Sequence, residues 1–149
     1  MKFVHTNLIA KNWRLLSEFY IKVFECKPVP PERNLKGVWL ENGTGVKNAA
    51  LQGIHLLLPG FDKDGPTLEI FQYQENEDKP YPMANREGFG HIAFSVDNIE
   101  MIIEKMILNG GSKLGKIVKK DYAKGSLVFT YAKDPEGNII ELQTWELKT

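Results

Sequence analysis

The stretch DPEGNIIELQTW, residues 134–145, decides the fold of this 149-residue chain. It begins as a turn, because Pro135 fixes one backbone angle and Gly137 accepts a positive φ, so the chain reverses before the apolar residues begin. The run from Asn138 to Trp145 then predicts a strand with Glu141 at its centre. A carboxylate in an apolar strand is costly to desolvate without a neutralising partner. Glu141 therefore requires either a buried ion pair or a ligand role.

The same pattern occurs earlier in the chain as DKDGPTLEIFQY, residues 62–73. A constant offset of 72 residues aligns the two stretches, and it pairs Asp62 with Asp134, Gly65 with Gly137, Glu69 with Glu141 and Tyr73 with Trp145. One central glutamate fits a buried ion pair equally well. Two glutamates at matched positions of a repeat favour a shared set of metal ligands.

Length and composition indicate one compact domain over residues 1–149, with 42% hydrophobic and 26% charged residues. The 19 basic residues balance the 19 acidic ones, which gives no electrostatic case for binding nucleic acid or an anionic membrane. We expect no signal peptide and no membrane span, since no apolar run is long enough. The single cysteine, Cys26, excludes an intrachain disulfide, suits a cytoplasmic protein and is expected to be a packed thiol.

The first half predicts a strand, a helix and three further strands. Lys2 to Ile9 alternates as a strand, with His5 on the same face as Ile9, and Asn12 is placed to cap a helix from Trp13 to about Val23. Three prolines, Pro28, Pro30 and Pro31, predict an irregular segment after the helix. Strands are expected near residues 37–41 and 53–58 and around Glu69.

The second half repeats this order after a polar linker at about residues 75–87. An offset of 86 aligns His5 with His91 in the stretch GFGHIAFSV, residues 88–96. Asp97 and Glu100 form a capping-box-like start for a helix that Gly110 and Gly111 end. Strands are expected near residues 115–119, 127–131 and 138–145. The prediction is an α+β fold of two tandem βαβββ units, about residues 2–74 and 88–147, forming an open, curved, mixed sheet around a metal cavity.

The two offsets differ by 14 residues, so we place an insertion of that length between Lys27 and Gly60. A sheet with a helix on its outer face leaves the other face free to bind a ligand or a metal ion. The repeat places four side chains there, each expected near the middle of its own strand; we call them the four proposed ligands: His5, Glu69, His91 and Glu141. For a single such histidine the alternative is a satisfied core residue.

Two imidazoles and two carboxylates suit a divalent first-row metal with coordination positions left for water or substrate. Thiolate-seeking metals are disfavoured, because no cysteine joins the set. The third histidine, His55, aligns with Leu127 at the offset of 72, so repetition gives it no ligand role. We expect His55 on a strand that borders the cavity.

These residues resemble the vicinal oxygen chelate superfamily over residues 3–145, and GFGHIAFSVDN and DPEGNIIEL are similar to signatures of glyoxalase I, the lactoylglutathione lyases. The resemblance implies a homodimeric enzyme that binds nickel, cobalt or zinc, with manganese or iron as alternatives. Its small-molecule substrate would chelate the metal through vicinal oxygens. Either Glu69 or Glu141 would move a proton next to the chelated carbonyl, and we favour Glu141.

Two positions depart from the glyoxalase I pattern. Ile9 stands where that family has an arginine, and Tyr73 where it has an asparagine that helps to hold glutathione. Losing a guanidinium removes charge-assisted binding of a carboxylate, typically worth about 1.5 to 3 kcal/mol, so the glutathione carrier is in question. The alternatives are an epimerase or extradiol-type dioxygenase of the same superfamily, and a metal-free ligand-sequestering protein of bleomycin-resistance type.

Overall fold

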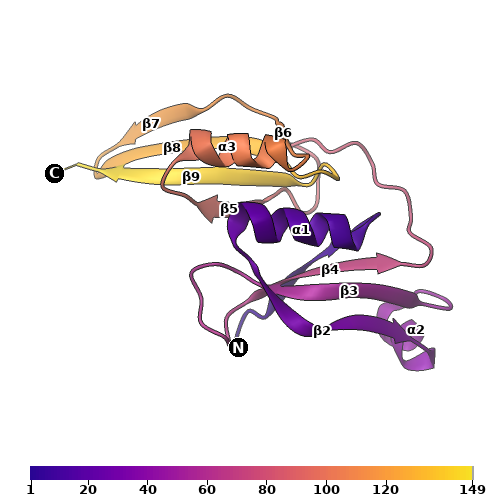
Figure 1. Cartoon of the computed structure of the whole chain (residues 1–149). Coiled ribbons are helices and arrows are strands. Elements are labelled where there is room, and N and C mark those ends of the chain that lie inside the picture. The colour runs from indigo at the N-terminus through magenta and orange to yellow at the C-terminus, as the bar shows by residue number, and fades with distance from the viewer. Residues whose placement is uncertain (149) are drawn as a thin grey trace. The chain divides into compact units, whose positions relative to one another are not determined.

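The computed structural model describes residues 1–148 and divides the chain into two compact units, Met1–Asp78 and Lys79–Thr149. We call them unit 1 and unit 2. Each unit has one open mixed sheet, and the fold is the expected α+β class (Figure 1). Within the described residues, no helix combines the length and the apolar character that crossing a membrane requires.

Unit 1 is a four-stranded sheet in the order β1-β4-β3-β2, with β1 parallel to β4 and the other pairs antiparallel. Helix α1 packs against β3 and β4 on one face, and the contact buries apolar side chains from both layers. Fully burying one such side chain stabilises the fold by about 1.5 to 3 kcal/mol. The elements are β1 (His5–Ile9), α1 (Trp13–Phe24), β2 (Lys27–Lys36), α2 (Val38–Thr44), β3 (Ala50–Leu57) and β4 (Thr67–Tyr73).

Strand β2 occupies the segment that its prolines predicted to be irregular, and that prediction is wrong. The strand lies at the edge of the sheet and pairs only with β3, so a residue without an N–H can occupy the unpaired side. A register shift between Val29 and Arg33 spans two of the prolines. The prediction of a strand near residues 37–41 is also wrong, because residues 38–41 belong to helix α2.

Unit 2 repeats the topology with its strands in the order β5-β9-β8-β6, and β7 also pairs with β8. Strand β5 is parallel to β9, as β1 is to β4. Helix α3 packs against β8 and β9. Its N-cap is Asn98 rather than the expected Asp97, and the Asn98 side chain accepts a hydrogen bond from Met101 N. The elements are β5 (Ile92–Ser95), α3 (Ile99–Leu108), β6 (Ser112–Lys113), β7 (Val118–Tyr122), β8 (Gly125–Lys133) and β9 (Ile139–Leu147).

The turn before β9 has the predicted form. The Asp134 carboxylate accepts hydrogen bonds from the backbone N–H of Glu136 at 2.9 Å and of Asn138 at 2.8 Å. Its second oxygen accepts from Asn138 Nδ2 at 2.7 Å. Gly137 has a φ of 82°, a backbone conformation that residues with a side chain rarely adopt. The turn therefore fixes where β9 begins and which face carries Glu141.

Candidate metal site

In unit 1, strands β1 and β4 bring His5 to Glu69. The parallel register pairs His5 with Thr67 and Asn7 with Glu69, so the imidazole reaches the carboxylate along the strand. His5 Nδ1 lies 3.3 Å from Glu69 Oε1, and Asn7 Nδ2 donates to the Glu69 carbonyl oxygen at 3.3 Å. His5 is the first residue of β1, so its expected place in the middle of a strand is wrong; Glu69 does lie inside β4.

A second imidazole also reaches this carboxylate. His55 on β3 lies directly opposite Glu69 in the antiparallel register, and its Nε2 is 3.2 Å from Glu69 Oε1. Glu69 is only 7% exposed, so both contacts are made in a partly dehydrated environment. Burial lowers the pKa of His55, and the nearby charges of Arg33 and His5 act in the same direction, whereas Glu69 opposes them.

In unit 2, the equivalent pair is His91 and Glu141. His91 Nε2 lies 3.0 Å from Glu141 Oε2. His91 immediately precedes β5, so it too lies at the start of a strand rather than in the middle. The Tyr131 ring lies 4.9 Å from the His91 ring, centroid to centroid. Burial raises the pKa of Tyr131, and the charge of Glu141 and a side-chain hydrogen bond to it act in the same direction.

The strand registers revise the counterpart of His55. His55 pairs with Glu69, and Tyr131 pairs with Glu141, so Tyr131 is the structural equivalent and the alignment with Leu127 is wrong. The cause is the length of the connection between the last two strands of each unit: residues 58–66 in unit 1 but only 134–138 in unit 2. A fixed offset aligned on the glutamates therefore slips by four residues on the preceding strand. Only the strand register could reveal this, because neither residue type repeats.

Each unit thus contains one of the two expected His–Glu pairs, and in unit 1 His55 contacts the same carboxylate. Nitrogen and oxygen donors of this kind fit a divalent first-row ion, and Glu69 and Glu141 are both recessed, with side chains 10% and 15% exposed. Among residues 1–148, no three or more His, Cys, Asp or Glu side chains are grouped as a metal centre.

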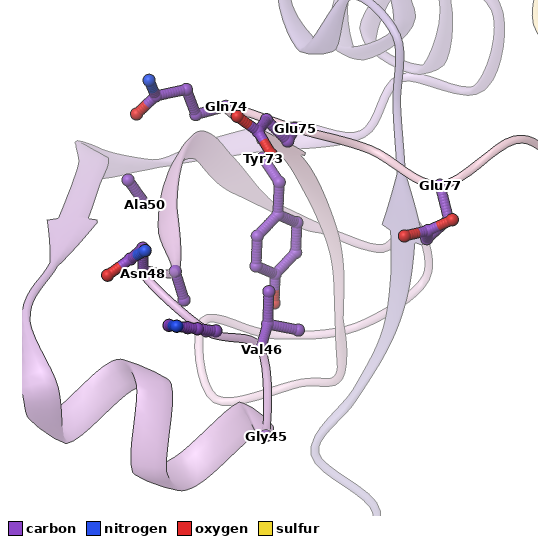
Figure 2. A pocket seen from close by; sticks show the side chains of 10 residues that line it. Gly45, Val46, Asn48, Ala50, Tyr73, Gln74, Glu75 and Glu77 are labelled. Carbon is purple, nitrogen blue, oxygen red and sulfur yellow. The ribbon is translucent and has the colours of Figure 1, made fainter.

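Tyr73, the second departure from the expected pattern, is held by apolar packing. It contacts the cluster of Leu40, Ala49 and Leu51 beside α2. Figure 2 shows its ring directed toward Val46. The ring lines a pocket of about 600 Å³ formed by residues 45–50, 73–75 and 77. None of these lining residues is a proposed ligand. The phenol ring therefore contributes to the packing of α2.

Cys26 is buried at 2% exposure, and burial raises its thiol pKa to about 12. A protonated, enclosed thiol is a poor nucleophile. The expectation of a packed thiol is therefore supported by the structure.

Comparisons with known proteins give the same family as the sequence resemblance. A family model described as Glyoxalase/Bleomycin resistance protein/Dioxygenase superfamily matches residues 2–142. A lactoylglutathione lyase of Schizosaccharomyces pombe is 31% identical over 150 residues, covering 95% of this chain and 46% of the relative. The chain thus spans about half the length of that curated relative.

Solved structures show the same fold. A glyoxalase family protein from Bacillus cereus is 17% identical with a TM-score of 0.75, covering 98% of this chain and 93% of its own. A glyoxalase family protein from Enterococcus faecalis is 23% identical with a TM-score of 0.60, covering 95% and 96% of the two chains. At such identities the likeness concerns the fold alone.

Proposed function

Because this chain belongs to the Glyoxalase/Bleomycin resistance protein/Dioxygenase superfamily, we propose that its four proposed ligands bind divalent metal and that it is a glyoxalase I-like lyase or isomerase. One observation carries the proposal: a histidine and a glutamate are in contact at the same place in the topology of both units. Chance burial of one His–Glu pair is ordinary, but its repetition across a duplicated fold favours a shared purpose.

The reaction we propose is proton transfer next to a carbonyl. A bound divalent ion would supply Lewis-acid stabilisation of negative charge on the vicinal oxygens of the substrate. The protein supplies the base, a carboxylate that removes the proton from one carbon and returns it to the next. We assign this role to Glu141, because Glu69 is more buried and its Oε1 lies between two imidazoles. A less buried carboxylate is freer to move with the proton.

Glutathione is a poor fit as the carrier of the substrate. Ile9 presents an aliphatic side chain where an arginine would bind a carboxylate, and the Tyr73 ring is committed to packing against the α2 cluster. A small oxygenated compound, or an adduct of a different thiol, would need neither group. The similarity to a lactoylglutathione lyase supports the proposed class of reaction. Ile9 and Tyr73 argue against a glutathione adduct as the substrate of this chain.

We also propose a cytoplasmic homodimer. Both sheets are open, and edge strands β1 and β5 each pair on one side only, which leaves backbone groups available for a second chain. The buried, reduced Cys26 is compatible with a reducing compartment. Sedimentation of the metal-bound protein at micromolar concentration should give a dimer; a monomer would reject this assembly.

Metal analysis and turnover together test the proposal. Purified protein should bind nickel, cobalt or zinc stoichiometrically and catalyse exchange of solvent deuterium into an α-hydroxycarbonyl substrate. With the methylglyoxal–glutathione adduct, kcat/KM should stay well below about 10⁶ M⁻¹s⁻¹, a value inside the usual enzyme range. Absence of stoichiometric metal would indicate a sequestering protein instead. Firmly bound iron(II) with oxygen-dependent ring cleavage would indicate a dioxygenase.

A further inference from the structure

Each proposed glutamate ligand has a polar side chain directly across from it on the neighbouring strand. His55 lies opposite Glu69 on the β3–β4 ladder, and Tyr131 lies opposite Glu141 on the β8–β9 ladder. Directly opposed residues on one sheet face lie within about 5.5 Å of each other at Cβ, so their side chains meet. The two positions are equivalent in topology although they carry different residue types.

In unit 1, two imidazoles contact the same carboxylate oxygen of Glu69. His55 Nε2 and His5 Nδ1 both lie against Oε1 of Glu69, at 3.2 and 3.3 Å. The His55 side chain is enclosed itself: only 24% is exposed, and its ring lies 5.6 Å from the Phe71 ring, centroid to centroid. A donor with so little rotational freedom fixes the plane of the carboxylate that it contacts.

The contacts in unit 2 have the same form. The Tyr131 ring packs on the His91 ring, and Tyr131 lies directly opposite Glu141, whose carboxylate helps to raise the pKa of the tyrosine hydroxyl. Phe129 packs edge-on against Tyr131 at 6.0 Å between ring centroids. Tyr131 therefore touches both proposed ligands of its unit and is itself held by a neighbouring ring.

We propose that His55 and Tyr131 are positioning residues for the metal centre: each holds the glutamate opposite it in the orientation that binds the ion. This inference rests on the proposed function. Partners that orient a ligating side chain typically account for a 10- to 100-fold difference in metal affinity. A donor from the adjacent strand suits this task, because the ladder fixes its distance to the glutamate before any metal binds.

The test is the equilibrium affinity for Ni²⁺ or Zn²⁺, measured by competition with a chromophoric chelator. His55→Leu and Tyr131→Phe should each weaken binding by about 10- to 100-fold while one ion per site still binds at saturation. His55→Gln, whose amide nitrogen can donate in place of Nε2, should recover most of the loss. Tyr122→Phe removes a hydroxyl from a tyrosine that packs on Trp145 and should leave the affinity unchanged. Thermal unfolding of each metal-free variant controls for damage to the fold.

Several outcomes would overturn the inference. Unchanged affinity in both His55→Leu and Tyr131→Phe, with normal binding by the wild type, would refute it and leave the proposed function standing. Complete loss of metal at saturation in His55→Leu, with failure of His55→Gln to restore it, would make His55 a ligand instead. A wild-type protein that binds no ion would refute the proposed function and this inference together.

Discussion

His91 Nε2 lies 3.0 Å from Glu141 Oε2, although fifty positions separate the two residues along the chain. The contact exists because β5 and β9 are parallel neighbours, with Ala93 opposite Glu141. The crossover through α3 and three further strands brings the two ends of unit 2 together. Folding of the unit therefore assembles the pair before any ion arrives, which reduces the ordering that metal binding must drive.

Removal of either kind of proposed ligand should abolish stoichiometric metal. We expect His5→Ala and Glu141→Ala to contain far less than one ion per site by elemental analysis, because each removes one of the four proposed ligands. His55→Ala, made as the control, should still fill the site at saturating metal. Full metal content in both ligand variants would refute the ligand assignment.

The sequence predicted those features of the fold that repeat. The turn at residues 134–138, the cap at Asn12 and the strand and helix that open each unit depend on local residue chemistry, and two copies of the strand–helix pattern reinforce one another. The error at β2 has a clear cause. Proline excludes a central strand but not an edge strand, and position in the sheet is a tertiary property that local sequence does not encode.

The candidate site was predictable in part for the same reason. The four proposed ligands repeat in type, and the contacts of His5 with Glu69 and of His91 with Glu141 follow from pairing the first and last strands of each unit. The role of His55 was not predictable, since its counterpart is a tyrosine and the loop lengths differ between units. The 14 additional residues of the first half lie in two places. Ten residues precede His55, in the segment that holds α2, and four lie between β3 and β4.

The Asp134 turn should matter more to stability than its counterpart in the first repeat. Asp134→Ala removes the acceptor for two backbone N–H groups and for the Asn138 amide, in a residue that is 2% exposed. We expect a loss of about 2 to 4 kcal/mol in the free energy of unfolding. Asp62→Ala changes an exposed aspartate and should cost less than about 0.5 kcal/mol. Urea denaturation followed by circular dichroism measures both; equal losses would contradict this account of the turn.

Cys26 should make the protein sensitive to alkali. Burial raises its thiol pKa to about 12, whereas the thiol of an unfolded cysteine has a pKa of about 8.5. Between these values the folded state keeps a proton that the unfolded state has lost, so the stability contributed by the thiol is complete below pH ~8.5 and falls by about 1.4 kcal/mol per pH unit above it.

The variant Cys26→Ala removes this titration. It should be less stable than the wild type at pH 7, because the substitution leaves a small cavity. The difference in the free energy of unfolding between the two proteins should become smaller between pH 9 and pH 11. Unfolding in urea at three pH values tests this difference. If the difference in the free energy of unfolding does not change with pH, the pKa of the buried thiol is not raised.

The identity of the carrier thiol can be tested at Ile9. This residue is 46% exposed on β1 and lies opposite Phe71 in the register, so an arginine can lay its stem along the ring and keep its head group in water. Ile9→Arg should change stability by less than about 0.5 kcal/mol. Tyr73→Asn is less suitable as a first step, because loss of the ring from the Leu40 cluster should cost about 1 to 3 kcal/mol.

If a missing positive charge excludes glutathione, Ile9→Arg should raise kcat/KM for the methylglyoxal–glutathione adduct by about 10- to 100-fold, the equivalent of one charge-assisted hydrogen bond. The gain should arise mainly through KM, since the carboxylate of the carrier is bound equally in the ground and transition states. Ile9→Met is the matched control for side-chain length without charge. With an adduct of glutathione diethyl ester, whose carboxylates are blocked, the advantage of Ile9→Arg should disappear. An equal gain with the ester would exclude carboxylate binding as the cause, and no gain with either adduct would place the specificity elsewhere, with the inserted α2 segment the next region to exchange.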